Sequence, residues 1–223
     1  MFGGLKVAII DYGMGNLFSV KRACDAVSLN AEITNDRKKI INSDGVLLPG
    51  VGAFGDAIEN LRKLDLIGAI KDYIASGKPF MGICLGMQLL MGESEEFGIH
   101  EGLKIFPGKV VKFPPTDSEG KKIKVPEIGW EGIYSNRNNW GNSMLKGIDQ
   151  NEYMYFVHSF YVVPDSKEII LSLSKYEGIE YASSLSKDNI FACQFHPERS
   201  AEKGLIIYRN FAQSLKIGGN DDK

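Results

Sequence analysis

Strand and helix patterns alternate through the N-terminal half of the chain. Short apolar runs rich in β-branched residues predict buried strands at Leu5–Ile10, Ala31–Thr34, Gly45–Leu48 and Lys78–Ile83. Apolar residues recur at helical spacing in Leu17–Val27, Asp56–Ala75 and Leu85–Met91. Within the second of these helices Gly68 is a weak point, and Gly77 is its expected stop. This alternation predicts an α/β fold, with an open, mostly parallel sheet and helices on both faces.

The C-terminal half is richer in strand patterns, which predict an antiparallel extension of the sheet. They lie at Leu103–Phe113, Tyr153–Val163, Glu168–Leu173, Ile179–Ser183 and Ile190–Phe195. A final helix is predicted at Ala201–Leu215, and the polar stretches Asp117–Lys122 and Asn136–Asn142 are predicted loops. The chain contains neither an internal repeat nor a linker-like stretch. We therefore expect residues 1–217 to form one domain and residues 218–223 a frayed tail.

Composition excludes several classes of protein. The chain has 26 basic and 28 acidic residues and a net charge of −2, which argues against a nucleic-acid or membrane coat. It has no uninterrupted apolar run of the roughly 18 residues that a spanning helix needs. The start, MFGGLKVAII, lacks the basic region of a signal peptide. Three scattered cysteines are no disulfide framework, so we expect a reducing, cytoplasmic location.

The pentapeptide Gly82–Gly86 carries the sharpest chemical signal. It lies between a strand pattern and a helix pattern, with Cys84 at its centre and a glycine at each end. This is the nucleophile-elbow arrangement with sulfur in place of the serine oxygen, and a helix N-terminus favours the reactive thiolate. The alternative is a buried structural cysteine beside two turn glycines. For Cys24 and Cys193, which lie on apolar faces of a helix and a strand, packing is the better interpretation.

A thiolate nucleophile needs a partner that accepts and returns a proton. His196 lies just after the last predicted strand, and Glu198 follows two residues later. In an extended segment both side chains project to one face, so the carboxylate can hold the imidazole in one tautomer. The alternative is a solvated histidine and glutamate. The other histidines are His100, in a polar and solvent-facing stretch, and His158, at a strand end.

The loop Pro49–Gly52 is the third element of the predicted site. Its glycines allow backbone N–H groups to turn toward a ligand, as an oxyanion hole requires. An ordinary turn is the alternative. The loop leaves the carboxyl end of a parallel strand, where open α/β sheets bind ligands.

The sequence disfavours a dinucleotide site and a zinc site. The pair Gly13 and Gly15 suggests a dinucleotide fingerprint, but the third glycine position is Phe18, which is too large. Clustered cysteines or histidines at zinc-ligand spacing are missing from the sequence, so we expect neither a metal nor another cofactor.

Several blocks together resemble one family, the class I glutamine amidotransferases. They are DYGMGNLFSV, LLPGVGAFGDA, GKPFMGICLGMQLL, KVPEIGW, YFVHSFY and CQFHPERS, and they cover most of the chain. Within the class, the first two blocks are most similar to the glutaminase subunits of imidazole glycerol phosphate synthases. The resemblance implies the class I amidotransferase fold and the following roles: Cys84 as nucleophile, His196 as base and then acid, Glu198 as its orienting group, an oxyanion hole at Gly50–Val51, and glutamine held near Gly52, Gln88, Ser159 and Phe160.

The resemblance also implies a reaction and a partner. Cys84 would attack the side-chain amide of L-glutamine, ammonia would leave, and water would cleave the thioester to glutamate. A separate cyclase of (β/α)₈ type, in a heterodimer, would receive the ammonia and form imidazole glycerol phosphate in histidine biosynthesis. Three alternatives stay open: a paralogue that feeds a sugar-modifying synthase in surface-polysaccharide assembly, a non-catalytic docking module, and a different cysteine hydrolase such as a peptidase.

The chain departs from the family pattern in one block. Where Pro-His-Met-Gly-Trp-Asn is expected, the sequence reads Pro126–Glu131, so Glu127 and Glu131 add two acids near the expected docking face. Arg199 stands where the family pattern favours lysine, and arginine is not equivalent to lysine at a paired contact. These departures concern the identity of the partner rather than the predicted triad.

Overall fold

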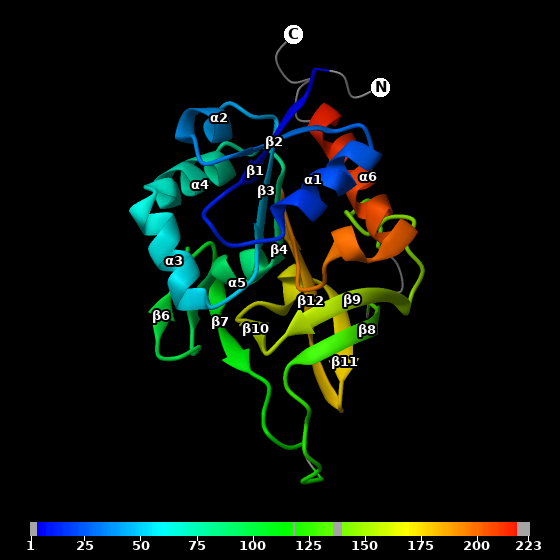
Figure 1. Cartoon of the computed structure of the whole chain (residues 1–223). Helices are drawn as coiled ribbons and strands as arrows, with labels where there is room; N and C mark the ends of the chain where they lie inside the picture. The colour runs from blue at the N-terminus through cyan, green and yellow to red at the C-terminus, as the bar shows by residue number, and fades with distance from the viewer. Residues whose placement is uncertain (1–3, 118, 136–139, 218–223) are drawn as a thin grey trace.

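A central sheet forms the core of the molecule. The computed structural model describes residues 4–117, 119–135 and 140–217. Within these ranges the main sheet has seven strands, in the order β11-β12-β13-β4-β3-β1-β2 (Figure 1). The parallel strands are β1 (Lys6–Ile10), β2 (Asn30–Thr34), β3 (Gly45–Gly50), β4 (Phe80–Cys84) and β13 (Ile190–Cys193). Two antiparallel strands, β12 (Ile179–Lys187) and β11 (Ile170–Tyr176), extend one edge. The predicted α/β sheet with an antiparallel extension is confirmed.

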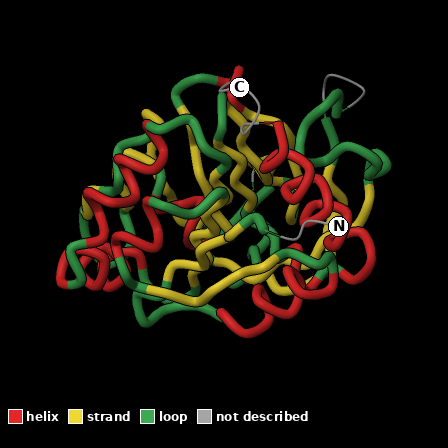
Figure 2. Tube along the Cα trace, turned by 90° about the horizontal axis from the view of Figure 1, so that it is seen from above, coloured by secondary structure: helices red, strands yellow, loops and turns green. Residues whose placement is uncertain are grey.

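Helices cover both faces of this sheet (Figures 1 and 2). On one face lie α1 (Leu17–Ala26) and α6 (Ala201–Ile217), and on the other lie α2 (Arg37–Ile41), α3 (Phe54–Lys63), α4 (Leu66–Ala75) and α5 (Leu85–Leu89). Alternate residues of a strand point to opposite faces. Val7 and Ile9 of β1 accordingly pack in the core under α1 and α6, whereas Ala8 and Ile10 pack under α3 and α4.

Two smaller sheets lie beyond the carboxyl end of β4. In the described part of the chain, one contains β10 (Phe160–Pro164), β7 (Phe106–Lys112), β5 (Met91–Ser94) and β6 (His100–Glu101), and the other pairs β8 (Glu127–Ile133) with β9 (Glu152–His158). Two short 3₁₀ helices, η1 (Lys167–Ile169) and η2 (Pro197–Arg199), precede β11 and α6. The β8–β9 hairpin reaches the end of β4, where the Cys84 sulfur lies 4.0 Å from the Val157 carbonyl oxygen. Strand β10 reaches α5, where Gln88 donates to the Phe160 carbonyl oxygen.

The structure corrects several predicted boundaries. The single strand expected at Tyr153–Val163 is two strands, β9 and β10, which break at Ser159 and join different sheets. The helix expected over 56–75 is also divided, but at Leu64–Asp65 rather than at Gly68, because Asp65 adopts a left-handed φ of 54°. The helix predicted at 85–91 ends at Leu89, and the sequence predictions missed α2, β5, β6 and β8.

Three predicted loop or tail segments fall wholly or partly outside the described residues. They are the tail 218–223, residue 118 of the first polar stretch, and residues 136–139 of the second.

Candidate active site

Cys84 occupies a strained turn between β4 and α5. Its φ is 55° and its ψ is −111°, a backbone conformation that non-glycine residues rarely adopt. The flanking glycines allow this turn to pack. A Cβ atom on Gly86 would lie 1.8 Å from the Leu48 carbonyl oxygen, and one on Gly82 would lie 3.0 Å from the Gly86 oxygen. The Gly-x-Cys-x-Gly pattern is therefore a steric requirement of this site.

His196 and Glu198 form a buried pair behind the cysteine. The Nδ1 atom of His196 lies 2.7 Å from Oε1 of Glu198, and their side chains are 4% and 1% exposed. The prediction that His196 and Glu198 lie in an extended segment is wrong, because Pro197–Arg199 forms the 3₁₀ helix η2. Proline at the first position of η2 favours this turn. The turn folds the carboxylate back onto the imidazole, so the two side chains meet by a different route from the one that the spacing predicted.

The sulfur of Cys84 is electrostatically coupled to His196. Burial lowers the pKa of His196, but the adjacent sulfur of Cys84 and the Glu198 carboxylate raise it, with a net pKa of about 10. Nε2 of His196 makes no hydrogen bond to any described residue. The imidazole thus keeps one nitrogen available on the side of the sulfur, in surroundings that favour its protonated form.

A cavity of about 400 Å³ opens in front of Cys84. Its walls include most of the substrate-binding residues that the sequence analysis named, namely Val51, Gly52, Gln88, Ser159 and Phe160. Gly50, His196 and Glu198 do not line it. Gly50 pairs with Cys84 in the sheet, and the other two are buried behind the sulfur. The predicted residues therefore form a pocket wall, a cysteine at the pocket and a buried pair behind that cysteine.

The loop after β3 follows the predicted glycine pattern. A Cβ atom on Gly50 would lie 2.1 Å from the hydroxyl oxygen of Tyr12, so the close approach excludes any larger residue. Gly52 has a φ of 107°, which glycine adopts without strain. Val51, between them, is 42% exposed at the pocket. The backbone at Gly50–Gly52 is therefore shaped for close contact with a ligand.

Gln88 links the pocket wall to Cys84 through Gln194. Its Nε2 atom donates to the Phe160 carbonyl oxygen at 2.9 Å and to Oε1 of Gln194 at 3.0 Å. The Nε2 atom of Gln194 in turn lies 3.6 Å from the Cys84 sulfur and donates to it. Sequence reasoning missed Gln194, although a glutamine in the otherwise apolar run 190–195 was an available signal.

Glu96 is a second pocket residue that the sequence did not reveal. Its Oε2 atom accepts a hydrogen bond of 2.7 Å from the backbone nitrogen of Phe54, at the start of α3, and the residue lines the pocket with Cys84. It comes from the loop after β5, which carries no motif. This contact places one carboxylate in the cavity.

Glu127 does not have the surface position that was expected for it. Its side chain is 1% exposed and faces inward, where Nε2 of His158 lies 3.2 Å from its Oε2 atom. The alternation of β8 instead exposes Ile128 and Trp130. The expectation that Glu127 adds an acid to the docking face is therefore wrong.

The remaining candidates do not form a second reactive site. Burial raises the pKa of the Cys24 thiol to about 12 and raises that of Cys193 well above its usual value. His100 is half-buried in β6 rather than fully solvent-facing. Among the described residues, no group of three or more acidic, histidine or cysteine side chains is placed to hold a metal ion. None of the described helices is long and apolar enough to cross a membrane.

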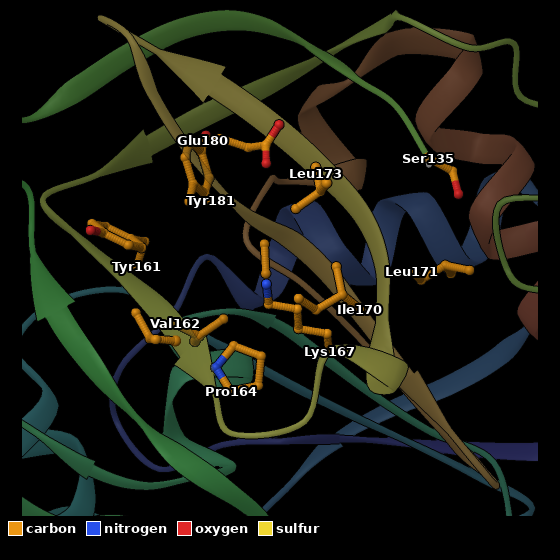
Figure 3. A pocket seen from close by; sticks show the side chains of 12 residues that line it. Ser135, Tyr161, Val162, Pro164, Lys167, Ile170, Leu171, Leu173, Glu180 and Tyr181 are labelled. Carbon is orange, nitrogen blue, oxygen red and sulfur yellow. The ribbon is translucent and has the colours of Figure 1, made fainter. Parts of the chain in front are cut away.

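A second cavity, of about 370 Å³, lies over β10, β11 and β12 (Figure 3). Its walls are mainly aliphatic, with Tyr161, Tyr181, Lys167 and Glu180 as the larger polar groups. It contains neither a cysteine nor a histidine. Among the cavities described, the one at the end of β4 therefore holds the candidate nucleophile Cys84.

Comparisons with known proteins show the family of the chain. The family model "Glutamine amidotransferase class-I" matches residues 8–214. The imidazole glycerol phosphate synthase subunit HisH of Caldanaerobacter subterraneus subsp. tengcongensis is 48% identical over 210 residues, which cover 94% of this chain and 98% of the relative. The HisH subunit of Moorella thermoacetica is 42% identical over 214 residues, covering 96% and 97%.

Solved structures share the fold at low sequence identity. The structure of PurLQS from Thermotoga maritima matches with a TM-score of 0.69 and 16% identity, and covers 96% of this chain and 98% of that chain. A structure titled glutamine amidotransferase matches with a TM-score of 0.68 and 15% identity, covering 94% and 98%. The chain therefore belongs to the class I glutamine amidotransferases and, within them, to the family of the HisH subunits of imidazole glycerol phosphate synthase.

Proposed function

We propose that the chain is a glutaminase subunit that hydrolyses L-glutamine to glutamate and ammonia through a thioester on Cys84. The observation that carries the proposal is the meeting of a strained cysteine, a buried His196–Glu198 pair and a pocket of about 400 Å³ at the end of β4. Nucleophile, base and orienting carboxylate are the three parts of a triad.

The geometry supports a two-stage reaction. The thiolate of Cys84 attacks the side-chain amide carbon, the carbon–nitrogen bond breaks, and imidazolium His196 protonates the departing ammonia. His196 then accepts a proton from water, which attacks the thioester and releases glutamate and the thiolate. Glu198 keeps the imidazole oriented in both stages through its 2.7 Å contact with Nδ1. Backbone N–H groups of the Gly50–Val51 segment would stabilise the oxyanion.

Glutamine has a charged amino group that the pocket must accommodate. Glu96 offers a carboxylate in the cavity, held by its hydrogen bond from the Phe54 nitrogen. We assign it to the α-ammonium group of the substrate, since opposite charges pair well in a partly enclosed site. Gly52, Gln88 and the backbone at Ser159–Phe160 would surround the rest of the molecule.

The proposed partner is a cyclase subunit of (β/α)₈ type, in a heterodimer. Ammonia released into neutral water becomes ammonium, which is no nucleophile, so the product must pass directly to a docked synthase. The outer face of the β8–β9 hairpin offers a docking surface, with Ile128, Trp130 and Tyr153 exposed by 60%, 47% and 60%. Exposed aromatic groups of this kind are enriched at protein interfaces.

This docking surface is continuous with the pocket. The ring of Tyr155 lies 6.0 Å from that of Trp130, and the guanidinium of Arg199 lies 5.1 Å from the Tyr155 ring centre. Arg199 and Pro126 also line the pocket itself. A partner seated on the hairpin would therefore cover the pocket mouth and could receive ammonia there. We propose that its product is imidazole glycerol phosphate, as the names of the relatives suggest.

The experiment is a glutaminase assay on the chain alone and with a purified cyclase subunit of the histidine pathway. We expect glutamate formation that rises when the cyclase and its nucleotide acceptor are present, and that disappears in Cys84→Ala. The absence of glutamate formation under every condition would refute the proposal. Stimulation by a sugar-modifying synthase but not by the cyclase would instead establish the paralogue.

We also propose that the protein works in the cytoplasm. All three of its cysteines are buried, free thiols in the described part of the chain, a state that a reducing compartment maintains.

A further inference from the structure

A buried carboxylate supports the glutamine pocket from behind. Glu127 opens β8 and pairs in register with His158 of β9. Its Oε2 atom lies 3.2 Å from Nε2 of His158, and the Tyr181 hydroxyl donates to its two oxygens at 3.1 and 3.0 Å. Burying a carboxylate is costly unless partners surround it. We call Glu127, His158 and Tyr181 the buried cluster.

The His158 imidazole lies between a carbonyl and the Glu127 carboxylate. Nδ1 is 2.8 Å from the Phe160 carbonyl oxygen, and because a carbonyl only accepts, Nδ1 carries a hydrogen. Nε2 lies 3.2 Å from Oε2 of Glu127, a close contact in which Nε2 makes no hydrogen bond to a described residue. The rings of Phe113 and Phe156, at 5.3 and 5.8 Å from the imidazole, shield the cluster.

The Phe160 carbonyl joins the buried cluster to the nucleophile. It accepts from both His158 and Gln88, and Gln88 continues to Gln194 and then to the Cys84 sulfur. His158, Phe160 and Gln88 all line the pocket. The chain of contacts thus runs without interruption from Glu127 to the reacting atom.

At the junction that His158 spans, the Ser159 carbonyl oxygen also accepts a hydrogen bond of 3.1 Å from the Phe113 nitrogen. Ser159 belongs to neither strand, and β9 and β10 join different sheets on its two sides. The bond from His158 to the Phe160 carbonyl crosses this junction. The direction of that bond depends on the imidazole, whose other nitrogen faces Glu127.

We propose that Glu127 is a positioning residue for glutamine binding. Through His158 it fixes the position of the Phe160 carbonyl. Through that carbonyl it fixes the positions of the Gln88 amide and of the Ser159–Phe160 backbone at the pocket wall. The inference rests on the proposed function, because it takes glutamine as the ligand. It assigns Glu127 no contact with the substrate.

The test measures glutamine binding without turnover. Calorimetry on the full chain carrying Cys84→Ala gives the dissociation constant for L-glutamine. Adding Glu127→Ala is expected to weaken binding about tenfold, the scale of removing a buried polar partner. Adding Glu127→Gln, whose amide still faces Nε2, is expected to restore affinity to within about threefold. The matched control is Glu32→Ala on β2, which removes an exposed strand acid that pairs with Lys39, away from the buried cluster, and should leave affinity unchanged.

A second measurement separates positioning from loss of structure. In the chain with Cys84 intact, iodoacetamide should still alkylate Cys84 alone in Glu127→Ala, since His196 and Glu198 are untouched, whereas loss of structure would expose Cys24 and Cys193 to the reagent as well. If Glu127→Ala does not fold, His158→Gln, which removes the Nδ1 donor, must show the weakened binding. Unchanged affinity in the folded Glu127→Ala or His158→Gln chain overturns the inference and leaves the proposed function standing. A Cys84→Ala parent that binds no glutamine overturns both.

Discussion

Nδ1 of His196 lies 2.7 Å from Oε1 of Glu198, and the turn of η2 between them brings the two side chains together. The contact settles the orientation of the imidazole, because a carboxylate can only accept at this distance and Nδ1 must therefore donate. The remaining nitrogen is left on the side of Cys84, without a hydrogen-bond partner among the described residues. A sequence separation of two residues thus fixes the orientation of the His196 imidazole.

Glu198→Gln tests this relationship. Glu198 and the Cys84 sulfur raise the pKa of His196 to about 10 against the opposing effect of burial, so removing the carboxylate lowers that pKa. The imidazole should then lose its proton at a lower pH, which weakens the thiolate–imidazolium pair. We expect kcat/KM for glutamine to fall about 10²-fold, within the range for general acid–base groups.

Nuclear magnetic resonance of the His196 ring directly measures whether Glu198→Gln lowers or raises the pKa of His196. The titration midpoint should move to lower pH in Glu198→Gln. A midpoint that stays in place or moves upward would contradict the role of the carboxylate. Glu202→Gln, in the first turn of α6 and on the surface, is the control.

The three thiols should differ sharply in reactivity. Burial raises the pKa of Cys24 to about 12 and that of Cys193 well above its usual value, so both remain thiols at neutral pH and are shielded from reagents. We expect iodoacetamide at pH 7.5 to modify Cys84 alone, as located by peptide mass spectrometry. Glutamine should slow the reaction by occupying the pocket. Rapid labelling of the Cys84→Ala chain at either other cysteine would count against this assignment.

Gly86→Ala should destabilise the elbow. A Cβ atom there would lie 1.8 Å from the Leu48 carbonyl oxygen, a backbone atom that cannot move without shifting β3. We expect the free energy of unfolding to fall by about 1–3 kcal/mol, as for other overpacked cores, measured by urea denaturation. Gly68→Ala in α4 is the matched control. Its Cβ would meet only Arg37, at 3.9 Å, and alanine favours a helix by about 1 kcal/mol. Equal stabilities for the two variants would refute the steric argument.

The parallel half of the fold was readable from sequence because its signals are local. The runs that became β1 to β4 are short, apolar and bounded by glycine or polar residues, so their hydrophobic pattern and their length both indicate strands. The break at Ser159 was not readable. Its neighbours continue the strand pattern on both sides, and only the pairing of β9 and β10 with different sheets separates them. The β8 segment contains two glycines and two glutamates and so lacked a strand signature.

The residues of the candidate site likewise fall into those that the sequence predicts and those that it does not. Cys84, His196 and Glu198 stand in short motifs whose chemistry depends on near neighbours, so the sequence could nominate them. Gln194 and Gln88 meet across 106 positions of sequence, and Glu96 reaches the backbone of Phe54 across 42. Contacts of that range depend on the assembled sheets rather than on local pattern. Residue type alone suggested a surface acid at Glu127, whereas strand alternation and pairing with His158 bury it.

The exposed face of the β8–β9 hairpin gives the last prediction. Trp130 is 47% exposed, packs edge-on against Tyr155 and lies beside the Arg199 contact that borders the pocket. Aromatic residues at an interface centre often contribute more than 1 kcal/mol each to binding, so Trp130→Ala should weaken cyclase binding about tenfold. Surface plasmon resonance with the cyclase measures this. Leu64→Ala, which removes a side chain of similar exposure (40%) at the junction of α3 and α4, is the control. If the control weakens binding and Trp130→Ala does not, the docking face lies on the helical side of the molecule instead of on the hairpin.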